Sequence, residues 1–119
     1  MYRIFFKSLH AIVLKAKQNN QLFVLVYFPQ RIQVQQRDWE LFRRRWNLNP
    51  DDFDLDLHNR RVTKYCRTHG INFLDLTSPF RDAARKQNMY LPNDGHPNQL
   101  GHVLAAQVLQ EFLSRKIHV

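Results

Sequence analysis

The spacing of apolar residues along the chain separates stretches with helical periodicity from short apolar runs. Apolar positions three or four residues apart predict helices over 3–18, 32–46, 59–69 and, after an N-cap at Asn98, toward the end of the chain. Two short runs rich in apolar residues, 22–28 and 71–76, predict strands. This order of elements is typical of an α/β domain, in which helices cover a parallel sheet.

Residues that favour helix ends place several boundaries. Gly70 predicts the end of the helix over 59–69. Ser78, followed by Pro79, predicts the N-cap of a short helix that runs to about Asn88. Four aspartates lie close together within 47–57. We interpret them as an acidic approach to the next helix, because the turn glycine and closing glutamate of a calcium loop are absent.

Both predicted strands have the character of central strands. The run 22–28 is apolar on both of its faces, which favours a strand buried between two layers of helices. Two parallel strands alone would both be edges with unpaired backbone groups. We therefore expect 1–119 to be a single, incomplete domain. Its further strands would come from additional chain or from another subunit, such as a second copy in a homo-oligomer.

The composition supports a folded domain without disulfides. The chain has 119 residues, of which 44% are hydrophobic, enough for a core. Cys66 is the single cysteine, so we expect it to lie buried or half-buried in the helix over 59–69. No apolar run approaches the roughly 18–20 residues that cross a bilayer. We expect no transmembrane segment and, for the chain as given, a location in the cytoplasm.

The net charge of +8 is concentrated in 31–45 and 60–67. We interpret most of this charge as solvated helix surface. Nucleic acid is not an expected partner, because no helix-turn-helix, zinc-finger spacing or RNA-binding aromatic motif accompanies the charge. A basic surface can still bind other anions. The side chains that would form it are Arg37, Arg43, Arg44 and Arg45.

The stretch before the last helix carries the candidate chemistry. Asp94 and His96 lie two residues apart on a predicted loop, so their side chains can face one site. Acyl-transfer enzymes use a histidine that takes a proton from a serine and returns it to the leaving group. A carboxylate on the other ring nitrogen fixes the tautomer and stabilises the imidazolium. Asp94 and His96 are therefore the candidate catalytic residues.

The same stretch resembles a known family. Asp94-Gly95-His96-Pro97-Asn98, followed by Gly101-His102 and the small residues Ala105 and Ala106, is similar to the last conserved block of the SGNH (GDSL-type) hydrolases. The segments 26–29 and 70–76 resemble strands of that family. The resemblance covers roughly 20–115 and is specific at 90–106.

This resemblance implies a fold and an activity. The fold would be α/β, part of a flavodoxin-like, three-layer SGNH sandwich with a small parallel sheet flanked by helices. The activity would be hydrolysis of acyl esters of carbohydrate or lipid, with His96 as general base oriented by Asp94. The family's chemistry needs no cofactor or metal, and its members are often exported or membrane-anchored.

The chain departs from the family pattern in two respects. One residue separates Asp94 from His96, whereas many members have two. The family's Gly-Asp-Ser nucleophile block, its glycine block and its asparagine block have no counterpart here. The serines are Ser8, Ser78 and Ser114, and none has the strand-to-helix context that exposes a nucleophile. We therefore expect the nucleophile segment to lie outside these residues and this chain alone to be inactive.

Two alternatives to catalysis remain. The chain can be a non-catalytic remnant or interaction module with a basic, anion-binding surface. A zinc site built from Asp94, His96 and His102 is also conceivable, although zinc sites usually show a recognisable ligand spacing.

Overall fold

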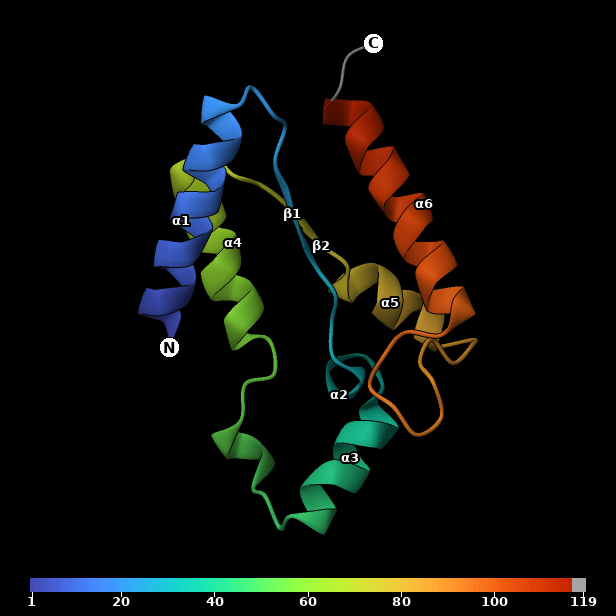
Figure 1. Ribbon diagram of the computed structural model, residues 1–119. Coiled ribbons are helices and arrows are strands. Elements are labelled where there is room, and N and C mark those ends of the chain that lie inside the picture. Colours follow the sequence, from blue (N-terminus) through green and yellow to red (C-terminus); the bar gives the residue numbers. More distant parts are fainter. Residues whose placement is uncertain (117–119) are drawn as a thin grey trace.

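The structure, a computed structural model, describes residues 1–116. The chain folds into helices on either side of a small sheet (Figure 1). In chain order the elements are α1 (Tyr2–Gln18), β1 (Val24–Tyr27), α2 (Arg31–Val34), α3 (Gln36–Arg45), the 3-10 helix η1 (Pro50–Asp52), α4 (Leu57–His69), β2 (Asn72–Asp75), α5 (Thr77–Ala84) and α6 (Gln99–Lys116).

The two strands pair in parallel, with Val24 opposite Asn72 and Tyr27 opposite Asp75. Helices α1 and α4 lie side by side on one face of the sheet, and α5 and α6 lie on the other (Figure 1). Side chains on the first face pack against a buried cluster of Leu9, Val62 and Cys66: Phe23, Leu25, Ile71 and Phe73. Those on the second face, Val26 and Leu74, pack against a cluster that contains Leu76, Phe80 and Tyr90. The predicted mixed α/β class, with helices on both faces of a parallel sheet, is confirmed.

The core is thin because the sheet is narrow. All eight strand residues are partly exposed, so neither strand is buried as deeply as a central strand. The radius of gyration is 16.3 Å, compared with about 13.5 Å expected for a compact domain of this length. Both strands have their outer edges open within residues 1–116. Cys66 is buried as predicted, and burial raises the pKa of its thiol.

The prediction of one helix over 32–46 is wrong. The chain forms α2, takes an extended conformation at Gln35 (φ −105°, ψ 107°) and then starts α3. The break follows from what the neighbouring side chains contact. Gln33 and Val34 are buried against the sheet and α5, whereas α3 contains no buried residue and extends away from the sheet (Figure 1). Periodicity alone did not reveal this change of direction.

The predicted N-cap at Ser78 is also wrong, because α5 begins at Thr77. The carboxylate of Asp75 accepts hydrogen bonds from the backbone N–H of Thr77 (2.9 Å) and from its hydroxyl (2.6 Å), which fixes the first turn. Two other boundary predictions are confirmed. Gly70 ends α4 in the left-handed conformation (φ 64°), and the side chain of Asn98 caps α6.

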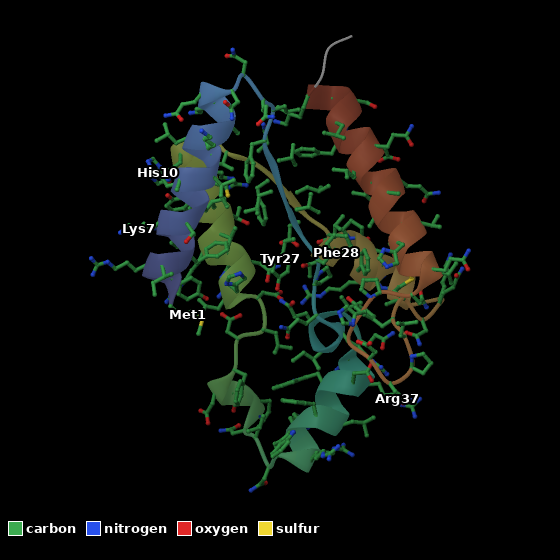
Figure 2. All side chains as sticks on the ribbon, in the orientation of Figure 1. Met1, Lys7, His10, Tyr27, Phe28 and Arg37 are labelled. Atoms are coloured by element: carbon green, nitrogen blue, oxygen red, sulfur yellow. The ribbon has the colours of Figure 1, made fainter. Side chains whose placement is uncertain are left out.

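Charged side chains of the outer helices face solvent. Figure 2 shows Lys7 and His10 pointing away from the sheet on the outer side of α1, and Arg37 pointing outward from α3. Among residues 1–116, no helix combines the length and the apolarity that a membrane crossing requires.

Candidate functional site

The loop that carries Asp94 and His96 connects α5 to α6 and is anchored beside the end of β1. Tyr90, at the start of the loop, is fully buried, and its hydroxyl donates a hydrogen bond to the carbonyl oxygen of Pro29 (2.8 Å). Tyr90 also forms an isolated antiparallel bridge with Pro97. The base of the loop is therefore closed and attached at the carboxyl end of the sheet.

Arg31 of α2 holds the same loop from the other side. Its guanidinium donates to the carbonyl oxygens of Leu91 (3.1 Å) and Pro92 (2.9 Å), and it pairs with Asp38 (3.0 Å). These contacts explain why the loop lies next to α2 in Figure 1. The sequence gives no local sign of them, since about 60 residues separate the partners.

Where the loop leads into α6, the backbone of Gly101 lies close to Met89 and Pro97. The side-chain oxygen of Asn98 accepts a hydrogen bond from the N–H of Gly101 (3.0 Å). A Cβ atom at Gly101 would lie 2.6 Å from the carbonyl oxygen of Met89 and 2.8 Å from Cβ of Pro97. Glycine is therefore required for α6 to pack against the base of the loop. A glycine in the first turn of a helix was the available signal for this role.

The structure brings Asp94 and His96 together. The carboxylate of Asp94 is hydrogen-bonded to Nδ1 of His96, and the same oxygen accepts from the backbone N–H of His96 (3.0 Å). A carboxylate only accepts, so Nδ1 carries the proton and Nε2 of the neutral ring is left as an acceptor. The side chain of His96 is 79% exposed. Nε2 is therefore open to an incoming group.

The contact stabilises the charged form of the Asp94 carboxylate. The side-chain hydrogen bond from His96, followed by the backbone hydrogen bond from the same residue, lowers the pKa of Asp94. Both groups are exposed, so solvent weakens their attraction. The arrangement orients the ring at little energetic cost. It gives the loop a positioned proton acceptor with a fixed tautomer.

The described residues bring no nucleophile to this acceptor. Ser8, Ser78 and Ser114 lie on α1, α5 and α6, and within residues 1–116 no hydrogen bond joins His96 to any of them. The hydroxyl of Ser114 donates instead to the carbonyl oxygen of Gln110 (2.8 Å). In the same part of the chain, no group of three or more His, Cys, Asp or Glu side chains is placed to hold a metal ion. His102, the third ligand of the conceivable zinc site, is an exposed residue of α6.

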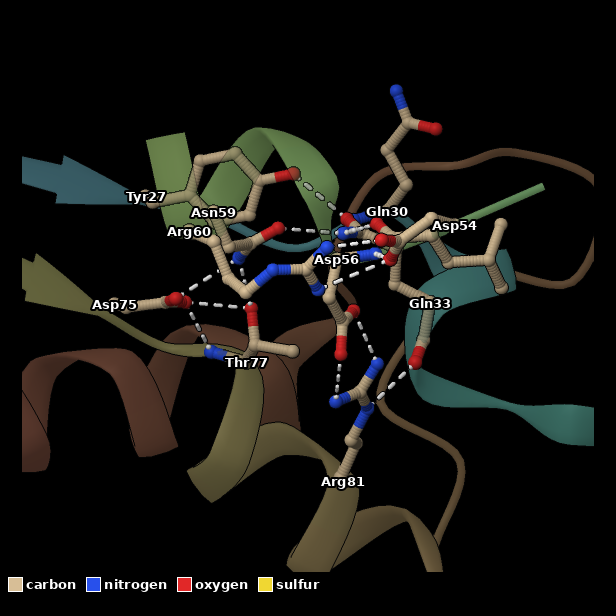
Figure 3. A network of polar contacts seen from close by, with 11 residues as sticks. Tyr27, Gln30, Gln33, Asp54, Asp56, Asn59, Arg60, Asp75, Thr77 and Arg81 are labelled. Atoms are coloured by element: carbon tan, nitrogen blue, oxygen red, sulfur yellow. Dashed lines mark hydrogen bonds and ion pairs between the residues drawn. The ribbon is translucent and has the colours of Figure 1, made fainter. Parts of the chain in front are cut away.

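A buried polar network lies at the carboxyl ends of both strands, with Asn59 of α4 at its centre (Figure 3). The Asn59 side-chain N–H₂ group donates to the carboxylate of Asp75 and to the hydroxyl of Thr77, both at 2.9 Å. Its oxygen accepts from the side chain of Gln33 (2.9 Å). Asn59 therefore connects α4, the end of β2, α5 and α2.

Gln33 and Arg81 extend this network. The Gln33 side-chain oxygen accepts from the Tyr27 hydroxyl at the end of β1 (2.8 Å), and Arg81 donates to the Gln33 carbonyl oxygen (2.8 Å). Arg81 also forms two hydrogen bonds with the carboxylate of Asp56 (2.9 and 2.6 Å). Burial raises the pKa of Tyr27, so its hydroxyl stays protonated as a donor. Sequence analysis did not single out this network, although a carboxylate directly after a strand and amides at apolar helix positions were visible signs of it.

The basic residues of α3 form the other candidate surface. Arg37, Arg44 and Arg45 are exposed. Arg43 is partly neutralised, because its guanidinium forms two hydrogen bonds with the carboxylate of Glu40 (2.9 and 2.5 Å).

Comparisons of the chain with models of protein families, with curated proteins and with solved structures find no match. The resemblance to SGNH hydrolases therefore rests on the residues of the chain alone.

Asn59→Ala should destabilise the protein by about 2–3 kcal/mol, because it removes a hydrogen bond from the buried Thr77 hydroxyl and from the partly buried Asp75 carboxylate. The measurement is the midpoint of urea unfolding. Asn93→Ala, an exposed loop control, should change the free energy of unfolding by no more than about 0.5 kcal/mol. Equal decreases in the free energy of unfolding of the two variants would contradict the role assigned to Asn59.

The carboxyl group of Asp94 should titrate below its ordinary pKa, because His96 stabilises its charged form. The pH dependence of its 13C chemical shift measures this, and His96→Ala should move the midpoint upward while His102→Ala leaves it unchanged. A lowered folded-state pKa means that the interaction stabilises the protein above the unfolded-state pKa of about 3.9. That stabilisation is lost as the pH falls through the folded-state value. A midpoint insensitive to His96→Ala would show that the contact does not persist in solution.

Proposed function

We propose that the Asp94–His96 loop is the acid–base part of a serine esterase of the SGNH type, which hydrolyses acyl esters. The nucleophilic serine would lie on a polypeptide segment outside these 119 residues. One observation carries the proposal: the Asp94 carboxylate binds Nδ1 of His96 and leaves Nε2 exposed. A triad histidine has this arrangement before it meets its serine.

The proposed chemistry assigns each group one task. Nε2 of His96 removes the proton of the serine hydroxyl as the oxygen attacks the ester carbonyl carbon. The Asp94 carboxylate stabilises the imidazolium that forms. The same proton then passes from Nε2 to the departing alcohol as the ester C–O bond breaks. Water repeats the sequence on the acyl-enzyme and releases the acid and the free serine.

The position of the loop supports this assignment. In open parallel sheets, ligands bind in the crevice beyond the carboxyl ends of the strands. Tyr90 and Arg31 hold the loop at that end, beside the chain that follows β1. We propose that the sheet belongs to a flavodoxin-like, three-layer SGNH domain. The open outer edge of β1 leaves room for its further strands.

The test is hydrolysis of short-chain p-nitrophenyl esters by the polypeptide that contains this chain together with its serine-bearing segment. His96→Ala should lower kcat about 10²–10⁴-fold, because the serine then lacks its base. Asp94→Asn should lower kcat as well, since the amide no longer holds the correct tautomer. His102→Ala is the matched control, an exposed histidine on α6 that should leave turnover unchanged. Turnover unaffected by His96→Ala would remove His96 from the mechanism.

The alternative function, a non-catalytic module that binds anions, is favoured by one observation on α3. Arg37, Arg44 and Arg45 are exposed there, next to Leu41 and Trp46, which are 56% and 61% exposed. No residue of α3 is buried, so its surface contributes little to the core.

Elution from heparin resin distinguishes binding by the basic surface of α3 from a general effect of the protein's net charge. The variant Arg44→Glu/Arg45→Glu should elute at lower salt than the wild type, because fewer cations contact the polyanion. Lys7→Glu/Lys15→Glu has the same net charge, with both changes on exposed positions of α1. It should elute at higher salt than the α3 variant. Co-elution of the two variants would contradict a specific site on α3.

A further inference from the structure

We propose that the outer edge of β2 binds an extended, acidic segment of another polypeptide, which adds to the sheet as a third strand. This inference goes beyond the proposed esterase chemistry and uses neither Asp94 nor His96. It rests on the open edge of β2, on two hollows that follow this edge, and on the charges that line them.

The backbone of β2 has a partner on one side only. Residues 72–75 pair with β1, and within residues 1–116 the sheet contains no strand beyond β2. Alternate residues of a strand direct their N–H and C=O groups to opposite sides, so part of the polar backbone of β2 faces outward. An added strand satisfies those groups by the mode known as β-strand addition.

The first hollow, of about 430 Å³, lies along this open side. It is lined by Cys66 and Arg67 of α4, by the β2 segment, and by Phe112 and Lys116 of α6. Because α4 and α6 cover opposite faces of the sheet, a hollow lined by both must pass around an edge. No residue of β1 lines it, so that edge is the outer edge of β2.

A second hollow, of about 580 Å³, continues the first toward the carboxyl end of β2. The two hollows share Thr63, Arg67 and Asp75. The carboxylate of Asp75 is already hydrogen-bonded to Asn59 and Thr77, so it is held back from an incoming segment. Together the hollows form a slot that runs along the whole strand and lies between the helix layers.

The charges of the slot define its occupant. Lys64 and Arg67 are exposed, and neither forms an ion pair with a carboxylate of residues 1–116. One wall of the slot is formed by α4, and the opposite wall is formed by α6. On the α6 wall, Lys116 lies over the ring of Phe112, with Nζ 5.6 Å from the ring centroid. A second copy of this chain that paired through the same edge would bring like charges together, which disfavours self-association. An acidic segment neutralises them.

The side chains on the two walls of the slot also predict a pattern in the sequence of the partner segment. Successive side chains of an added strand point to opposite faces of the sheet. Those on the α4 face meet Lys64 and Arg67, whereas those on the α6 face meet Phe112. The expected partner sequence therefore alternates acidic and apolar residues. β2 spans four residues, or about 13 Å, so a short segment suffices.

The test uses the peptide acetyl-Val-Glu-Val-Glu-Val-Glu-Val-amide, whose binding to the full chain is measured by isothermal titration calorimetry. It should bind, and its affinity should fall as salt is added. The same peptide with every backbone nitrogen methylated has no N–H donor for the ladder on either edge and should not bind. A peptide of identical composition, with its valines and glutamates grouped in blocks, should bind at least about tenfold more weakly, since it cannot match both walls.

Variants of the chain locate the site. Lys64→Glu/Arg67→Glu should weaken binding by about tenfold or more, whereas Lys7→Glu/Lys15→Glu, with the same net charge, should not. His96→Ala should bind as the wild type does, so this result is independent of the esterase proposal. The proposal is overturned if the peptide does not bind, if the methylated peptide binds equally well, or if the α1 and α4 variants lose the same affinity.

Discussion

The buried amide of Asn59 is the contact on which the arrangement of this chain depends. A two-stranded sheet buries little apolar surface, so hydrophobic packing alone does not fix the direction in which each helix leaves it. Asn59 joins the end of β2, the start of α5 and, through Gln33, the end of β1. A buried polar network is stabilising when every member is satisfied, because each group would otherwise be desolvated without a partner. The network thus fixes how α2, α4 and α5 meet at the carboxyl end of the sheet.

The Asp94–His96 pair benefits from that support while it remains in solvent. Tyr90 and Arg31 fix the loop from the side of β1, and Gly101 lets α6 pack against its base. A positioned imidazole in water is nevertheless a modest catalyst, because high dielectric weakens the help its carboxylate gives. The same pair becomes effective when a neighbouring surface excludes water and presents a hydroxyl to Nε2. In the proposed esterase, the loop would supply the orientation of the imidazole, and a covering segment would supply the water-excluded environment.

Most elements could be predicted from the sequence, because periodicity and helix-end residues act locally. The Asp94–His96 contact was also predictable, since residues two apart on a loop can face one site. The errors at Gln35 and Ser78 have different causes. The helix breaks at Gln35 because Gln33 and Val34 are buried against distant elements. The start of α5 moved by one residue through a local contact, between Asp75 and Thr77. The supports of the loop were hidden because Arg31 and Tyr90 contact residues about 60 positions away in the chain.

A segment that pairs with the open edge of β2 does not by itself reach the exposed Nε2 of His96. Which end of the sheet it reaches depends on the direction in which it runs. A strand that runs parallel to β2 ends at the carboxyl edge of the sheet, where Tyr90 and Arg31 hold the loop. A strand that runs antiparallel ends at the opposite edge, far from that loop. Nucleophiles of α/β hydrolases follow directly after a strand, so only a parallel segment would carry such a residue to the carboxyl edge of the sheet. The direction in which a segment adds to β2 therefore decides at which edge of the sheet that segment ends.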